Sequence, residues 1–154
     1  MDANRGAWLT LGAGLSFGVA LLHVAIIVIG APGYLYFGAV DLARLAAHGS
    51  FLPALLTLGL AAIFAGFGFY ALSGAGLVRR LPLLTLGLIF VGSLYTLRGL
   101  VLVLDLLRLA RGADYPLRQT LFSATSLAMG LVYLFGTARR WGYLKMQDHV
   151  ARRR

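Results

Sequence analysis

The sequence predicts an all-α integral membrane protein, an antiparallel four-transmembrane-helix bundle with a short external amphipathic helix between helices 1 and 2. The chain of 154 residues is 60% hydrophobic and 12% charged, whereas soluble domains carry about 25% charged residues. Its apolar residues gather into four runs of about 22 residues, and a helix of that length crosses the roughly 30 Å hydrocarbon core of a bilayer. The runs are 8–29, 51–72, 83–104 and 117–138.

The basic residues between the runs predict how the helices are oriented. Nine of them fall on one side of a four-span topology and four on the other. Because Lys and Arg are retained on the cytoplasmic side, we expect both termini in the cytoplasm. The preference for arginine over lysine suggests a bacterial protein, and therefore the bacterial cytoplasmic (inner) membrane. The nine are Arg5, Arg79, Arg80, Arg139, Arg140, Lys145, Arg152, Arg153 and Arg154; the four are Arg44, Arg108, Arg111 and Arg118.

The composition also excludes several functions. The chain has no cysteine, which rules out disulfides, thiolate metal sites and cysteine nucleophiles. Residues 1–154 leave no room for a separate soluble domain, so we expect a single membrane domain. No phosphate-binding glycine loop is present, and we expect no metal, no cofactor and no enzymatic activity. The net charge of +9 would suit a nucleic-acid partner, but its confinement to the gaps favours lipid, and no nucleic acid is expected.

The first run ends at a cluster of helix-breaking residues, 30–33, and opens the external segment 31–50. Within that segment, 39–48 has the pattern of a short amphipathic helix. It would lie at the outer interface with its apolar side facing the membrane, or it is simply a solvated connecting helix. Its polar face carries Asp41, Arg44 and His48, of which the first two can pair at i, i+3.

Prolines and short loops mark where the remaining runs begin and end. Pro53 falls in the first turn of the second run, where its missing N–H costs nothing. A tight cytoplasmic hairpin, 73–82, then leads to the third run, which Pro82 opens. A short outer loop, about 109–116, precedes the fourth run, and a basic tail, 139–154, follows it. Arginines beside aromatic residues at span ends suit anionic lipid head groups. The expected anchoring residues are Arg79, Arg80, Arg139, Arg140 and Trp141.

Polar side chains at one depth mark a candidate site. Arg98 and His23 lie about 22 Å along runs that lead outward, and Thr57 and Ser123 lie about 9 Å along runs that lead inward. All four therefore fall in the outer third of the bilayer. Two further residues share faces with them, because Asp105 follows Arg98 by two turns and Gln119 precedes Ser123 by one. The candidate polar cavity comprises His23, Thr57, Arg98, Asp105, Gln119 and Ser123.

Two interpretations of this layer stay open. In the first, His23 and Arg98 line an outward-facing cavity, where an arginine fork suits a carboxylate or phosphate and the histidine titrates near neutral pH. In the second, the polar groups hold helices together, with Arg98 reaching toward Asp105 or a lipid phosphate. Asp105 also has Arg108 at i+3 as a partner.

Small residues spaced four apart predict close helix packing. Gly14 and Gly18 form a GxxxG motif, which lets helix backbones approach in membranes. Such pairs either hold the four helices together or join protomers. Further pairs are Ala61 with Ala65, Ala62 with Gly66, and Ser126 with Gly130.

Five segments between His23 and Gly99 carry a resemblance to known sequences: 36–39, 53–55, 70–76, 79–84 and 98–99. On these residues the chain resembles an uncharacterised family of small four-helix bacterial inner-membrane proteins with no known activity. The resemblance implies fold and compartment and no site.

We expect a non-enzymatic accessory or interaction protein, alone as a homo-oligomer or within a larger membrane complex. The alternative is a small oligomeric transporter or binder of an anionic or proton-coupled solute.

Overall fold

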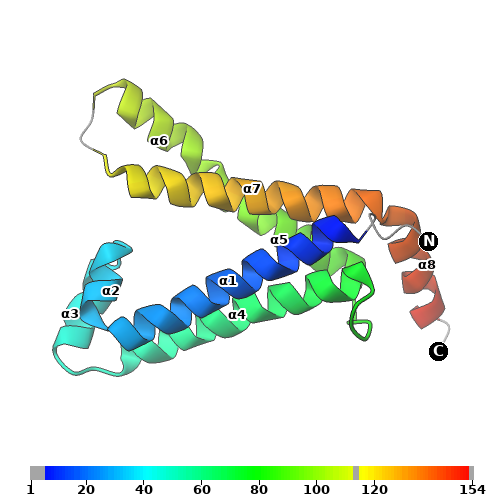
Figure 1. Cartoon of the computed structure of the whole chain (residues 1–154), viewed down its shortest axis with the longest axis horizontal. Coiled ribbons are helices and arrows are strands. Elements are labelled where there is room, and N and C mark those ends of the chain that lie inside the picture. The colour runs from blue at the N-terminus through cyan, green and yellow to red at the C-terminus, as the bar shows by residue number, and fades with distance from the viewer. Residues whose placement is uncertain (1–5, 113–114, 153–154) are drawn as a thin grey trace. The chain divides into compact units, whose positions relative to one another are not determined.

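The computed structural model describes residues 6–112 and 115–152, with side chains up to residue 146 in the last helix. Every regular element in these residues is a helix (Figure 1). The predicted all-α fold class is confirmed. The chain groups into two compact units, Met1–Ala13 with Phe69–Arg154 as unit 1 and Gly14–Gly68 as unit 2, each described by itself. Arg5, Arg153 and Arg154, and the side chains of His149 and Arg152, lie outside the described residues.

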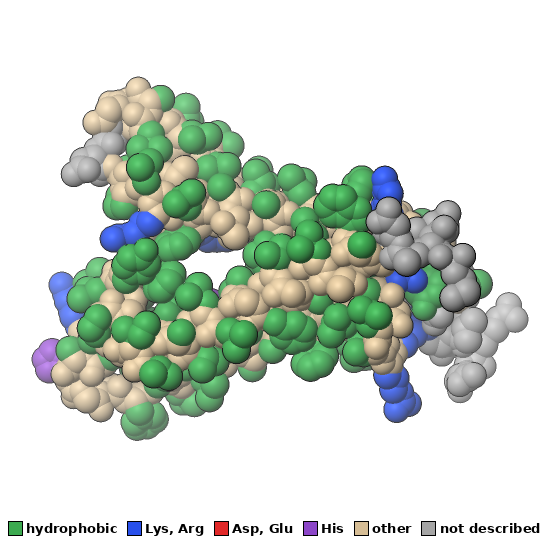
Figure 2. Space-filling view, viewed as in Figure 1, with side chains coloured by type: hydrophobic (Ala, Val, Ile, Leu, Met, Phe, Trp, Pro, Cys, Tyr) green, Lys and Arg blue, Asp and Glu red, His purple; other side chains and the backbone are tan. Residues whose placement is uncertain are grey.

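Four helices are long and apolar enough to cross a membrane, with mean hydropathies from 1.5 to 2.2. The chain is a multi-pass membrane protein by the length and composition of these helices. Hydrophobic side chains cover much of the visible flanks of the long helices (Figure 2). The four spans are α1 (Ala7–Ile29), α4 (Leu52–Ala75), Leu84–Ala110 and α7 (Leu117–Arg139).

The third span is broken into α5 (Leu84–Gly99) and α6 (Val101–Ala110). At the break, the Leu100 N–H bonds the Thr96 carbonyl at 2.9 Å, whereas the Val103 N–H bonds the Leu100 carbonyl, only three residues back. The helical span extends past the predicted apolar run 83–104 to Ala110. Within this extension Arg108 contacts Asp105 and Tyr115.

Glycines bring α5 and α7 close together in unit 1. A Cβ atom added at Gly99 would overlap the backbone of Leu127, and one at Gly130 would overlap the backbone of Thr96. Only glycine permits this approach, since any side chain would force the two backbones apart. The Gly130 motif is therefore used inside the chain.

Unit 2 contains a helix that the sequence did not predict, α2 (Ala31–Tyr36). The predicted break at residues 30–33 is confirmed, because α1 ends at Ile29. The chain then begins a new helix, and Pro32 lies in the first turn of α2, where proline is tolerated. Gly30 turns the chain with a φ of 75°. The expected amphipathic helix is α3 (Val40–Ala47), and Ala43 packs into a small core with Ile26 and Tyr34.

A second unpredicted helix, α8 (Trp141–Arg152), follows α7 and turns away from its axis (Figure 1). The sequence analysis treated 139–154 only as a basic tail. Leu144 explains the difference, because its side chain is 0% exposed and holds α8 against the rest of unit 1.

Candidate functional site

Three of the predicted polar residues meet in unit 1, each from a different helix. Arg98 at the end of α5 donates a hydrogen bond from Nη1 to the Ser123 Oγ of α7, at 3.2 Å. Ser123 in turn donates its hydroxyl proton to Oδ2 of Asp105 on α6, at 2.7 Å. The serine therefore accepts from a cation and donates to an anion. The result is a chain of charge-assisted hydrogen bonds across the break in the third span.

Two further residues extend this network at its outer end. Arg108 Nη1 lies 3.9 Å from the other carboxylate oxygen, Oδ1 of Asp105, and the Arg108 guanidinium lies over the Tyr115 ring at 5.3 Å. Hydrogen bonding to the Asp105 carboxylate and desolvation raise the pKa of Tyr115 above its usual value, although Arg108 opposes the rise. The spacing of Asp105 and Arg108 pointed to that pair, whereas nothing in the sequence marked Tyr115.

Burial and charge are divided unevenly within the network. The Asp105 side chain is 0% exposed, whereas Arg98 and Arg108 are both exposed. Two guanidinium groups thus face one buried carboxylate, which leaves one positive charge in excess. Gln119, one turn before Ser123, is half-buried.

The other two residues of the predicted layer belong to unit 2. Thr57 is 3% exposed and accepts a hydrogen bond from the Tyr34 hydroxyl, at 3.1 Å. This bond fixes α2 to α4. The His23 ring donates from Nδ1 to the Val19 carbonyl at 2.8 Å and lies 4.9 Å from the Phe64 ring. The idea that all six residues share one cavity stays a prediction.

The polar face of α3 is open. Asp41 and Arg44 form the i, i+3 pair expected from the sequence, with their closest N and O atoms 3.7 Å apart and both side chains largely exposed. The His48 ring donates from Nδ1 to the Arg44 carbonyl at 2.7 Å. An exposed pair of this kind stabilises the helix only slightly.

Basic residues at the other end of unit 1 lie over aromatic rings. The distances from cation to ring centroid are 4.9 Å for Arg139 over Phe135, 4.2 Å for Arg140 over Tyr143, and 5.0 Å for Lys145 over Trp141. Arg79 is exposed, and Arg80 is half-buried. Such cation–π contacts hold the charged groups beside aromatic residues that prefer the membrane interface.

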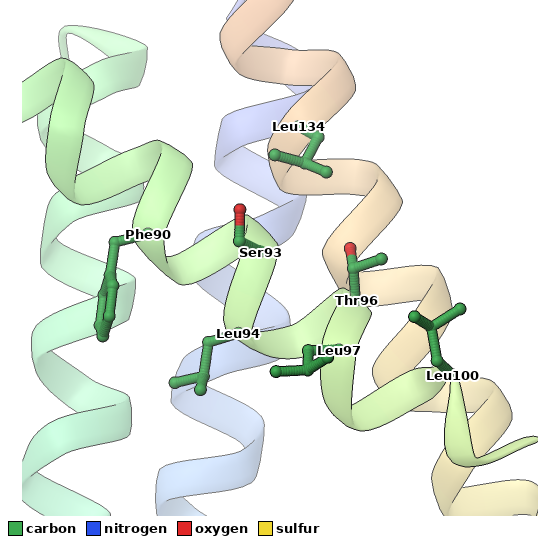
Figure 3. A pocket seen from close by; sticks show the side chains of 7 residues that line it. All are labelled: Phe90, Ser93, Leu94, Thr96, Leu97, Leu100 and Leu134. Atoms are coloured by element: carbon green, nitrogen blue, oxygen red, sulfur yellow. The ribbon is translucent and has the colours of Figure 1, made fainter.

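An apolar groove of about 420 Å³ also lies along the last turns of α5 (Figure 3). Leu134 of α7 closes one side, and residues of α5, among them Phe90, Leu94 and Leu97, make up most of the lining. The Thr96 hydroxyl beside it donates to the Gly92 carbonyl at 2.8 Å. A groove lined this way on a membrane span suits lipid tails and offers no reactive group.

These features define a class: a small, multi-pass, all-helical membrane protein with an internal polar network. No protein-family model, curated protein or solved structure matches the chain. Among the residues that the structure describes, no group of three or more His, Asp or Glu side chains could hold a metal ion.

Proposed function

We propose that this chain is a non-enzymatic accessory protein of the bacterial inner membrane, which docks against the transmembrane helices of a partner. One observation carries the proposal. Gly14 and Gly18 of the GxxxG motif are exposed, and a Cβ atom added at either would meet nothing within 4 Å. A motif of this type permits close helix approach, and within unit 2 no neighbouring helix occupies it.

The open surface extends along α1 as a seam of residues spaced three and four apart. This spacing places them on one helical face. Leu21 is 69% exposed and Val28 is 82% exposed. The α1 seam is Gly14, Gly18, Leu21, Ala25 and Val28.

A comparable face runs along α4. Gly59 and Gly66 also have open space around them, and Ala62 between them is exposed. The α4 seam is Leu55, Gly59, Ala62 and Gly66. Both seams place small residues at their centre, where lipid contact alone would allow large apolar side chains.

The small residues of unit 1 behave differently. A Cβ atom added at Gly92 would clash with Leu134, and Gly99 and Gly130 lie where α5 and α7 cross. One set of small residues therefore packs α5 against α7, and another set, in the two seams, stays open. The polar network of Arg98, Ser123 and Asp105 is likewise bonded internally, which supports a structural role for it.

The test is the mass of the particle extracted from membranes in a mild detergent. A single chain contributes 16.5 kDa, and we expect the wild-type particle to contain additional protein. Gly14→Leu with Gly18→Leu should release the single chain without unfolding it, because a Cβ atom at either position meets nothing within 4 Å. The matched control is Gly142→Leu in α8, which also has open space. A double variant that keeps the full mass would contradict the proposal.

An alternative function has one observation in its favour. The excess positive charge of the Arg98–Asp105–Arg108 cluster suits an anionic solute, carried by a small oligomeric transporter or binder. Under this alternative, Arg98→Gln abolishes the thermal stabilisation that small carboxylates or phosphate give the purified protein. If Arg98→Gln keeps the same thermal stabilisation by these anions, the alternative function is contradicted.

A further inference from the structure

A polar cavity lies in unit 1 where the end of α4 turns into α5. It encloses about 210 Å³, smaller than the roughly 300–1,000 Å³ pockets that hold drug-sized ligands. By contrast, the larger hollows of about 420 and 580 Å³ have mostly apolar linings. The cavity is lined by Ser73 and Gly76 at the end of α4, Val78 and Arg80 in the turn, Leu84 of α5, and Tyr143 of α8.

Positive charge surrounds this cavity. Arg80 is part of the lining, and the Arg140 guanidinium lies 4.2 Å from the ring centroid of Tyr143, which also lines it. These two guanidinium groups favour an anion as the occupant of the cavity.

The backbone of the α4–α5 turn is fixed around the cavity. The buried Ser73 hydroxyl oxygen accepts a hydrogen bond from the Leu81 N–H at 3.0 Å, and the Tyr70 hydroxyl donates to the Pro82 carbonyl at 3.3 Å. Both bonds hold the segment that carries Arg80. Leu83 gives the first turn of α5 no side-chain cap, and the positive end of the helix dipole lies beside Leu84.

The position of the cavity identifies the source of the anion. The flanking spans end at Ala75 and begin at Leu84, so the cavity lies at the membrane boundary, where lipid phosphates are found. Arginine forks bind phosphate through paired hydrogen bonds, and basic pockets between spans bind lipid head groups. We propose that this cavity binds the phosphate group of an anionic lipid. This inference is independent of the helix docking proposed above.

The experiment compares two neighbouring arginines in the full chain. The purified protein is titrated in detergent with short-chain phosphatidylglycerol, with phosphatidylcholine of equal chain length, and with inorganic phosphate, and binding is followed by native mass spectrometry and thermal unfolding. Arg80→Gln removes the charge in the cavity lining. Arg79→Gln is the matched control, because it removes an equal charge from an exposed position.

We expect Arg80→Gln to weaken phosphatidylglycerol binding about five-fold, with phosphatidylcholine and inorganic phosphate binding far more weakly to all forms. Equal weakening by Arg79→Gln would overturn the site in favour of diffuse attraction. Inorganic phosphate that binds as well as the lipid would overturn the lipid as its source. Should Arg80→Gln fail to fold, Tyr143→Phe serves instead, because it removes a hydroxyl and keeps the ring beneath Arg140. Unchanged lipid binding by that variant would also overturn the site.

Discussion

Ser123 on α7 donates a 2.7 Å hydrogen bond to the buried carboxylate of Asp105 on α6. Since Ser123 also accepts from Arg98, a single hydroxyl links the two halves of the broken third span to the fourth span. Inside a bilayer there is no water to form a hydrogen bond with a polar group that has lost its protein partner. The end of unit 1 that carries α6 therefore depends on this serine.

Substitutions at the two ends of this bond should differ in cost. Ser123→Ala removes one donor from the buried carboxylate and the acceptor from Arg98, and we expect a loss of about 1–3 kcal/mol in unfolding free energy. Asp105→Asn keeps an acceptor for the serine and should cost less. Thermal or denaturant unfolding in detergent measures both. In the double variant the costs should not add, and full additivity would mean that the two side chains act separately.

The glycines at the α5–α7 crossing should tolerate no side chain. Gly99→Ala and Gly130→Ala force the two backbones apart, and overpacking of this kind costs about 1–3 kcal/mol. Gly14→Ala is the matched control, because open space surrounds that position. Unfolding in detergent compares the three variants. Equal stability in all of them would show that the α5–α7 contact is looser than described.

The Tyr115 phenol should lose its proton only at a higher pH than an ordinary tyrosine. Its pKa is raised, so the folded state favours the protonated phenol. That contribution to stability is fully present below the ordinary pKa of 10.0 and is lost as the pH rises through the raised value. The difference between the spectrophotometric titration curves of wild type and Tyr115→Phe gives the ionisation of Tyr115 alone. In Asp105→Asn the Tyr115 phenol should lose its proton at a lower pH than in wild type. If it does not, the Asp105 carboxylate is not the cause of the raised pKa.

Both ends of the chain should face the cytoplasm. The excess of arginine and lysine beside the termini and the α4–α5 turn predicts this orientation. A reporter enzyme that is active only in the cytoplasm, fused after Arg154, should therefore be active. A fusion after Gly49, between α3 and α4, is the control and should be inactive. The reverse pattern would invert the topology.

Length and hydropathy sufficed to predict the four spans, because crossing a bilayer imposes a minimum run of apolar residues. Local signals predicted the end of the first span, because α1 ends at Ile29 and Gly30 turns the chain. They did not predict α2, whose first turn accommodates Pro32, or the helical residues up to Ala110 that follow the third apolar run. Short helices of this kind depend on contacts with neighbouring elements, which the sequence does not show.

The candidate site was predictable only in part. Helix rise gives depth and predicted Arg98 and Ser123 at one level, and in the structure these two side chains bond to each other. Depth does not show which way a side chain points around its helix axis. The sequence therefore could not distinguish polar side chains that line a cavity from side chains that bond to each other. Nor could it show which small residues pack internally. Gly130 and Gly18 sit in similar motifs, yet only Gly130 is enclosed by a neighbouring helix.

Photo-cross-linking in native membranes tests the proposed docking most directly. The chain lacks cysteine, so a thiol-reactive photo-cross-linker can be attached at Ala25→Cys in the α1 seam or at the exposed Leu60→Cys outside both seams. We predict a protein adduct from position 25 that Gly18→Leu abolishes, and lipid adducts alone from position 60. Lipid adducts alone from both positions, or a protein adduct indifferent to Gly18→Leu, would contradict a docking role for the open glycines.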